Sequence, residues 1–184
     1  MQFTFSALLI MFLFFLATIF LNAAQHDVLE RLKKFAEVLE RMRGGGIKAT
    51  LENIQDCGGY RALHYAAMGG SMNVLSYLLE EMKVDVNVKD GSGKTPLYCA
   101  AKEGRLAAVK FLLRMGANPE IPDDIKNASP LHAAAARGHK DIIPLLLSKG
   151  IDVDVMSDFG AALHVAAASG HHETVKVLLD HGAN

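Results

Sequence analysis

Residues Gly91-Ser92-Gly93-Lys94-Thr95 come closer to a catalytic motif than any other segment of this chain. A Gly-Lys-Thr sequence can hold nucleotide phosphates through backbone amides and a lysine ammonium group. That phosphate-binding loop also requires a glycine five positions before the Gly-Lys pair, and this chain has Val88 there. We therefore expect these residues to form a turn, with no bound nucleotide.

The histidines could in principle hold a metal ion or act as general bases, and the densest group is His171-His172-Glu173. Adjacent residues of a helix point about 100° apart, and the His-Glu-x-x-His spacing of zinc proteases is missing. Asp158-Phe159-Gly160 matches one kinase motif, but no glycine-rich loop or His-Arg-Asp segment accompanies it. These groups therefore predict neither a metal site nor a catalytic site.

The charge balance and the two cysteines exclude further classes of function. The chain has 19 basic and 20 acidic side chains, so no strong positive field favours nucleic acid. Cys57 and Cys99 lack the spacing of a zinc pair or a disulfide framework, and we expect reduced structural thiols. No Ser/His/Asp or Cys/His arrangement can be placed either. We expect no enzymatic activity, no metal and no cofactor.

The elements that position these residues form a repeat. A Leu-x-x-Ala-Ala core occurs four times, at spacings of 34, 34 and 32 residues, and begins at Leu63, Leu97, Leu131 and Leu163. A period near 33 residues is typical of a solenoid of helix pairs. The shorter last spacing predicts a distorted finger before Leu163.

This pattern resembles the ankyrin repeat family, in which Thr-Pro-Leu-His-x-Ala-Ala precedes a glycine and an apolar outer helix that ends in Leu-Leu-x-x-Gly-Ala. All four copies match its Leu-x-x-Ala-Ala part, and the copy from Thr95 to Ala117 includes the Thr-Pro pair. The resemblance implies an all-α ankyrin-repeat solenoid of helix-turn-helix pairs with hairpin-like fingers, which binds proteins and rarely catalyses. It also implies that His64, His132 and His164 hydrogen-bond between neighbouring turns.

The second repeat predicts its own helix ends. Thr95 should cap an inner helix over residues 96–102, with Pro96 in its first turn. An outer helix should follow over residues 106–114 and end at Gly116 in the left-handed conformation. The small Ala100-Ala101 pair should let neighbouring inner helices pack closely.

The other repeats depart from this pattern in ways that affect stability. Arg61-Ala62 and Ala161-Ala162 replace the Thr-Pro pair, so two inner helices should lack a side-chain cap. Asn127 stands where glycine is usual, but asparagine tolerates a left-handed backbone. Pro144 lies inside the expected outer helix over residues 139–148, which should therefore kink or begin late.

The first 21 residues differ in chemistry from the rest. No charged side chain precedes Asp27, and the apolar run over residues 3–21 would form a helix about 28 Å long, close to the thickness of a hydrocarbon core. Basic residues such as Arg31 follow it and none precedes it, which would keep the repeats in the cytoplasm. The segment is a candidate membrane anchor; a cleaved signal peptide and a misassigned first exon are the alternatives.

Residues 22–58 are interpreted as a degenerate N-terminal repeat and a loop around Gly44-Gly45-Gly46. Apolar residues recur there at helical spacing, at Val28, Leu32, Phe35 and Leu39. Residues 59–184 hold the four recognisable repeats without a polar capping repeat, so we expect the protein to continue past Asn184. The arrangement is similar to plant proteins that join ankyrin repeats to a C-terminal tetratricopeptide domain, which is missing here.

The candidate binding residues are those that the repeat pattern does not dictate. Resemblance to ankyrins implies that a partner contacts the concave face of the inner helices and the fingertips. The inner-helix candidates are Tyr65, Met68, Lys102, Glu103, Ala136, Arg137 and Ser169. The fingertip candidates are Lys89, Ser92, Lys94, Asp123, Asp124, Ile125, Lys126, Ser157 and Phe159.

We therefore predict a non-enzymatic, monomeric scaffold or adaptor that binds a protein partner and no nucleic acid. The alternative is a membrane-tethered ankyrin protein whose role depends on residues 3–21.

Overall fold

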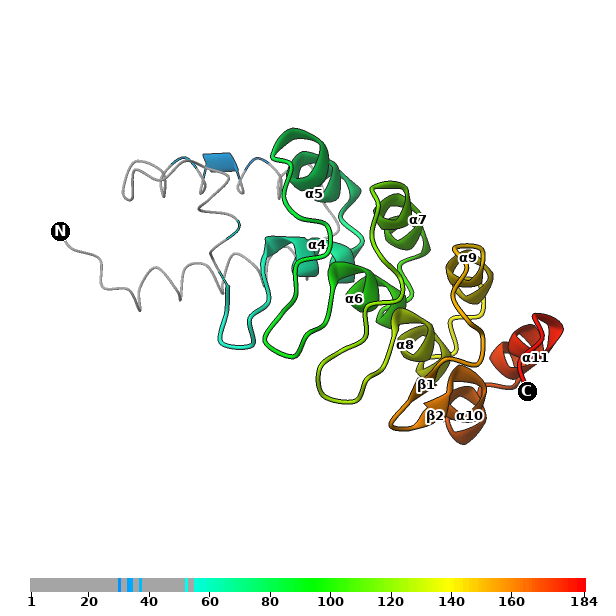
Figure 1. Cartoon of the computed structure of the whole chain (residues 1–184). Coiled ribbons are helices and arrows are strands. Elements are labelled where there is room, and N and C mark those ends of the chain that lie inside the picture. The colour runs from blue at the N-terminus through cyan, green and yellow to red at the C-terminus, as the bar shows by residue number, and fades with distance from the viewer. Residues whose placement is uncertain (1–29, 31–32, 35–36, 38–51, 53–54) are drawn as a thin grey trace.

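The computed structural model describes residues 30, 33, 34, 37, 52 and 55–184. Helix pairs stack in one direction along this part of the chain, and each pair is preceded by a finger (Figure 1). The inner helices are α4 (Ala62–Gly69), α6 (Pro96–Lys102), α8 (Pro130–Ala136) and α10 (Ala162–Ala168). The outer helices are α5 (Met72–Ser76), which continues as the π-helical turn η1 (Tyr77–Glu81), α7 (Leu106–Arg114), α9 (Ile143–Leu147) and α11 (His172–Asp180). The predicted repeat solenoid of helix pairs is confirmed.

The candidate membrane anchor, residues 1–21, lies outside the described residues. Most of the degenerate N-terminal repeat, residues 22–58, lies outside them as well. Among the helices that the structure describes, none is both long and apolar enough to cross a bilayer.

The helix ends of the second repeat follow the local sequence. Thr95 Oγ1 accepts a hydrogen bond of 3.2 Å from the backbone N–H of Tyr98, and Pro96 lies in the first turn of α6. Gly116 follows α7 with a φ of 88°, in the left-handed region that ends many helices. The predicted bounds of α6 and α7 are confirmed.

The departures from the repeat pattern also have the expected effects. Arg61 and Ala161 provide no side-chain hydrogen bond to cap α4 and α10. Asn127 adopts a φ of 52°, so it takes over the left-handed position of a glycine. Helix α9 begins late, at Ile143, with Pro144 in its first turn, because proline lacks the amide hydrogen that a position inside the helix requires.

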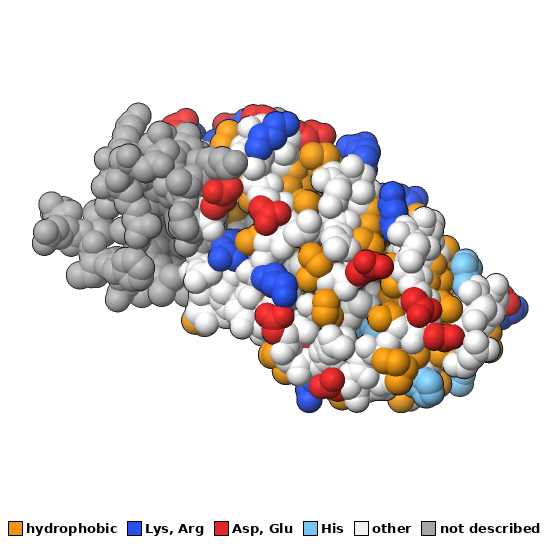
Figure 2. All heavy atoms as spheres, in the orientation of Figure 1, with side chains coloured by type: hydrophobic (Ala, Val, Ile, Leu, Met, Phe, Trp, Pro, Cys, Tyr) orange, Lys and Arg blue, Asp and Glu red, His pale blue; other side chains and the backbone are white. Residues whose placement is uncertain are grey.

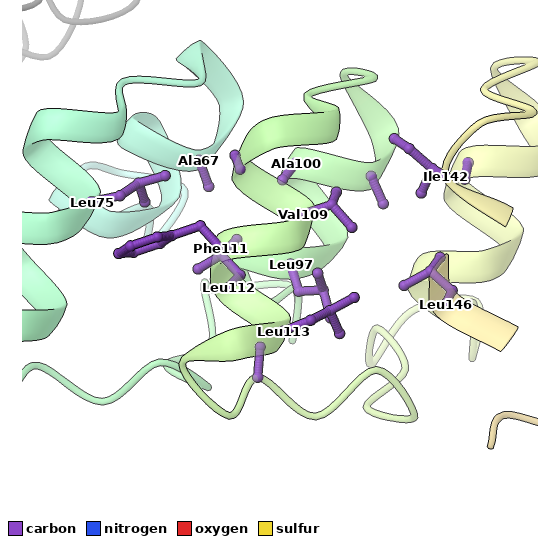
Figure 3. Close-up of a cluster of buried hydrophobic side chains, with 14 of the residues drawn as sticks. Ala67, Leu75, Leu97, Ala100, Val109, Phe111, Leu112, Leu113, Ile142 and Leu146 are labelled. Atoms are coloured by element: carbon purple, nitrogen blue, oxygen red, sulfur yellow. The ribbon is translucent and has the colours of Figure 1, made fainter. Parts of the chain in front are cut away.

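The core lies between the inner and outer helices and runs through every described repeat. Figure 3 shows Ala67 and Ala100 between α4 and α6, with larger side chains such as Leu97 and Leu112 beneath them. The side chains of these four residues are fully buried. Alanine at the inner-helix contact keeps the helices close, and a larger residue would separate them.

The fourth finger is shorter than the others but regular, so the predicted distortion is wrong. Strands β1 (Met156–Ser157) and β2 (Gly160–Ala161) pair antiparallel, with Ser157 opposite Gly160. Gly160, directly after the two residues that join the strands, has a φ of 90°, a left-handed conformation that glycine adopts without strain. Because the fourth finger has fewer residues than the others, it forms a tight hairpin.

Candidate protein-binding surface

Buried histidines connect two of the described repeats to the finger that follows each of them. His64 Nε2 lies 3.0 Å from the carbonyl oxygen of Lys94, and His132 Nε2 lies 3.1 Å from that of Gly160. In each case the helix pair holding the histidine and the finger holding the carbonyl belong to successive repeats. His64 and His132 thus connect neighbouring turns, as the resemblance implied for these two residues and for His164.

The hydrogen bonds at the other ring nitrogen determine the tautomer of these histidines. The backbone N–H of Arg61 donates to His64 Nδ1 at 3.1 Å, and that of Ser129 donates to His132 Nδ1 at 3.2 Å. Since Nδ1 accepts, the single ring proton lies on Nε2 and is donated to the carbonyl oxygen. Burial lowers the pKa of both imidazoles below the usual 6.5, so both are neutral at pH 7.

In the other two described repeats, the residue at the position of His64 and His132 makes different contacts. Tyr98 replaces the histidine on α6 and points to the carboxylate of Asp123 in the next finger; burial, then Asp123, raises its pKa well above the usual 10. His164 on α10 is exposed and makes no side-chain hydrogen bond to a described residue. The histidine contact is therefore present at two of the four positions.

A second set of side chains connects each repeat to the one before it. Each of these residues directly follows a turn glycine. Its side chain donates to a carbonyl oxygen near the end of the inner helix of the preceding repeat. The contacts are Arg105 Nε to Met68 O at 2.8 Å, His139 Nε2 to Lys102 O at 3.0 Å and His171 Nε2 to Ala136 O at 3.1 Å. The sequence alone did not predict these contacts, although the position of all three side chains directly after a glycine is visible in it.

The fingertips are joined to one another by backbone hydrogen bonds. The N–H of Gly91 donates to Gly58 O at 2.9 Å, which joins the first two fingertips. The N–H of Asp124 donates to Ser92 O at 2.9 Å, and the N–H of Asp158 donates to Lys126 O at 3.0 Å. This row of hydrogen bonds fixes the fingertips relative to each other.

A carboxylate or a hydroxyl shapes each fingertip from within. Asp90 Oδ1 accepts from the N–H groups of Ser92 and Lys94, both at 2.8 Å. Asp56 and Asp123 accept pairs of backbone N–H groups in the same way, and the Ser157 hydroxyl donates to Gly160 O in the fourth finger. Such side-chain bonds hold tight turns without regular secondary structure. Asp123, a predicted binding residue, is therefore a buried shaping residue of its fingertip.

The structure exposes most of the other fingertip candidates. Ile125 and Phe159 keep 59% and 61% of their surface accessible, and the Lys126 ammonium group lies 5.4 Å from the centre of the Phe159 ring. Lys89 Nζ forms a 2.8 Å ion pair with Asp124 Oδ1. Ser92, Lys94 and Ser157 are partly buried.

The inner-helix candidates line the same side of the solenoid. Arg137 and Ser169 are exposed; the half-buried ones are Tyr65, Met68, Lys102, Glu103 and Ala136. The Tyr65 hydroxyl donates to Asp56 Oδ2 at 2.5 Å, and burial raises its pKa well above the usual 10. Tyr65 thus supports the first finger from the helix behind it.

The chain was compared with models of known protein families. The model for ankyrin repeats, described as three copies, matches residues 20–123 and 115–184. The chain belongs to the ankyrin repeat family. A search of curated proteins found no match to it.

Ankyrin turns account for the residues that first suggested chemistry. Residues 91–95 form the second fingertip and the cap of α6. His171 is bound to Ala136 O, and Glu173 lies 3.5 Å from Lys140 Nζ. Within the described residues, no three His, Cys, Asp or Glu side chains gather as metal ligands would.

The ankyrin surface carries charges of both signs. Figure 2 shows basic, acidic and apolar side chains interspersed along the described repeats on the face in view. A polar groove of about 430 Å³ lies between the first two fingertips, beside Cys57, Arg61 and Lys89. Arg61 donates to the carbonyl oxygens of Lys89 and Glu52, which joins the groove wall to the second finger.

Proposed function

We propose that this ankyrin protein is a non-enzymatic adaptor that binds another protein through its concave face and fingertips. The observation that carries the proposal is the exposure of Ile125 and Phe159 on fingertips that are joined by the Asp158–Lys126 backbone hydrogen bond. Large apolar side chains held in place within a polar rim are typical of the residues that dominate protein interfaces.

Rigidity supports this mechanism. The forward contacts of His64 and His132, the backward contacts of Arg105, His139 and His171, and the fingertip hydrogen bonds restrain neighbouring repeats. A surface whose side chains are already ordered loses little conformational entropy when a partner binds. The solenoid would therefore present its contact residues without rearrangement.

The experiment is an unbiased selection of binders followed by mapping. A random 12-residue peptide library displayed on phage is selected on the immobilised full chain, and selected peptides are mapped by amide hydrogen exchange. We expect protection in the fingers and inner helices, residues 89–103, 123–137 and 156–169. Protection confined to α7, α9 and α11, on the opposite side, would contradict the proposal.

A paired variant controls for loss of fold. Phe159→Ala should weaken selected peptides at least five-fold, because it removes an exposed anchor without touching the core. Leu179→Ala on α11 removes a side chain that is 52% exposed but lies on an outer helix, and it should leave binding unchanged. Equal losses of peptide affinity in both variants would show that the fingertips are not part of the binding surface.

Several finer expectations are part of this proposal. The membrane-tethered alternative depends on residues 3–21, and a tetratricopeptide domain would lie beyond Asn184. A monomeric state and a cytoplasmic location remain predictions too. Alkaline extraction of membranes from cells, with intact mass of the recovered protein, tests the anchor and the length of the chain together.

A further inference from the structure

The fourth repeat lies at one end of the described stack, and no described residue covers its outward side. In Figure 1, α10 and α11 are the last helices of the row, beside the C-terminus. Each of the other three inner helices contacts the inner helix of the next repeat. We call the uncovered side of α10 and α11 the end face; its apolar residues are Leu163, Ala167, Val175 and Leu179.

The end face repeats a surface that is buried within the stack. The equivalent residues of the second repeat are all buried: Leu97, Ala101, Val109 and Leu113. On the end face, Leu163 and Val175 are half-buried and Ala167 is exposed. Leu179 has 52% of its surface accessible, whereas its equivalent Leu113 has 8%. The end face thus exposes apolar side chains at positions that are covered inside the solenoid.

Two charges of opposite sign lie beside the apolar residues of α11. Lys176 and Asp180 are exposed, lie one helical turn apart and form no ion pair with a described residue. In the first two repeats, an ion pair joins the outer helices, with Arg114 at 3.8 Å from Glu80. Asp180 also lies at the C-terminal end of α11, where the helix dipole disfavours an anion. A cation from another molecule would therefore be favourable beside Asp180.

We infer that the end face binds a second copy of this chain, with the two α11 helices packed antiparallel about a two-fold axis. An axis midway between Lys176 and Asp180 places the lysine of each copy opposite the aspartate of the other. Val175 and Leu179 have the same separation, so nearly the same axis brings Val175 of one copy beside Leu179 of the other. The end face is therefore complementary to itself in charge and in apolar contacts.

A head-to-tail arrangement of two copies fits less well. The first described repeat of one copy would then stack on the end face of the other. Equivalent positions of neighbouring outer helices meet, as Glu80 and Arg114 do, so Glu80 would face Asp180 and two anions would repel. The first described repeat also contacts the N-terminal part of its own chain, since the Lys33 ammonium group lies 5.2 Å from the Tyr77 ring centre. Both observations favour the two-fold pair.

This pair would be weak, because it involves one helix pair of each copy and small interfaces are typical of transient association. We expect dissociation in the micromolar range, so the predicted monomer is the state of the dilute protein. The fingertips lie outside the end face and stay accessible, so a dimer would present two binding surfaces at once. It would bind more tightly to a partner that repeats its binding segment.

Sedimentation velocity of the full chain between 1 and 200 µM tests the association. We expect a concentration-dependent shift from monomer to dimer and no larger species, because a two-fold contact is closed. Leu179→Glu should weaken dimerisation at least ten-fold, since it places a carboxylate in the apolar contact, and it should retain the fold because Leu179 is exposed. Lys110→Glu changes the exposed lysine of α7 that is equivalent to Lys176, and it should leave dimerisation unchanged. Circular dichroism and a thermal melt check that each variant is folded.

An exchange of charges tests the antiparallel geometry. Lys176→Glu and Asp180→Lys should each weaken the dimer at least three-fold, because each sets like charges opposite one another. The double variant restores opposite charges, so its dissociation constant should return to within about two-fold of the original. A double variant that dimerises no more tightly than the single variants would contradict the proposed pair.

Four other results would overturn the inference. Three come from sedimentation: a monomer at every concentration, association that survives Leu179→Glu, or oligomers that grow beyond the dimer. The fourth is a longer chain from cells whose added residues protect α10 and α11 from hydrogen exchange, because its own continuation would then cover the end face. Failure of the proposed function would look different, since library peptides that map away from the fingers and inner helices would reject the adaptor surface and leave dimerisation unchanged.

Discussion

The imidazole Nε2 of His64 lies 3.0 Å from the carbonyl oxygen of Lys94, thirty residues further along the chain. The ring is fully buried, and its Nδ1 accepts the backbone N–H of Arg61. One side chain thus supplies a cap for the start of α4 and a contact to the next finger. This double role explains why α4 tolerates the loss of the usual Thr-Pro pair.

Removal of this imidazole should be costly. His64→Ala leaves the Lys94 carbonyl and the Arg61 N–H without a partner and opens a cavity, so we expect a loss of about 2 to 4 kcal/mol in the free energy of unfolding. Urea denaturation followed by circular dichroism measures it. His164→Ala is the matched control, because His164 is exposed, and it should change stability by less than about 0.5 kcal/mol. Equal effects would show that His64 acts through helix propensity alone.

Stability should fall as the pH drops below about 6.5. Burial lowers the pKa of His64 and His132 in the folded protein, whereas the unfolded chain binds protons near 6.5. The unfolded state then holds more protons than the folded state, and protonation favours unfolding as the pH falls. Urea midpoints between pH 7.5 and 5.5 measure this slope.

A double variant assigns the pH effect to these two groups. His64→Gln with His132→Gln removes both titrating groups, so its midpoint should depend less on pH than that of the unchanged chain. An unchanged slope in the double variant would assign the pH effect to other groups.

Close packing of the inner helices predicts the cost of a larger residue. Ala134 on α8 is fully buried, so Ala134→Leu should destabilise the protein by about 1 to 3 kcal/mol. Ala107→Leu introduces the same residue at an exposed position of α7 and should change stability by less than about 0.5 kcal/mol. Thermal melts of both variants provide the comparison, and a neutral Ala134→Leu would mean that the helices can separate without cost.

Two turn glycines separate backbone strain from a steric clash. Both Gly104 and Gly116 have a positive φ, of 69° and 88°. A Cβ at Gly116 would have no heavy atom within 4 Å, but one at Gly104 would lie 2.5 Å from His139 Cε1. Gly116→Ala should cost about 1 to 2 kcal/mol, and Gly104→Ala about 2 to 4 kcal/mol because His139 must also move.

A His139→Ala background tests the cause of that difference. Without the imidazole, Gly104→Ala should cost no more than Gly116→Ala, since only the backbone strain remains. Urea denaturation of the single and double variants gives the coupling between the two sites. If the stability losses of Gly104→Ala and His139→Ala simply added in the double variant, a clash with His139 would be contradicted.

Local sequence determined the repeat and its helices because their causes lie within a few residues. The Leu-x-x-Ala-Ala cores predicted four inner helices, Thr95 and Pro96 predicted the start of α6, and Pro144 predicted the late start of α9. The left-handed turn at Asn127 followed from the side chain itself. Each of these depends on backbone hydrogen bonds and dihedral preferences that neighbouring residues decide.

Only the tertiary structure decided which side chains join one repeat to another. The sequence places His139 and Lys102 thirty-seven residues apart, and nothing local indicates that the imidazole reaches that carbonyl. The same holds for the burial of Asp123 and for the exposure of Met156. Such contacts depend on the register of stacked repeats and on the length of each finger. The shorter fourth finger therefore forms a regular hairpin, where the spacing alone had predicted distortion.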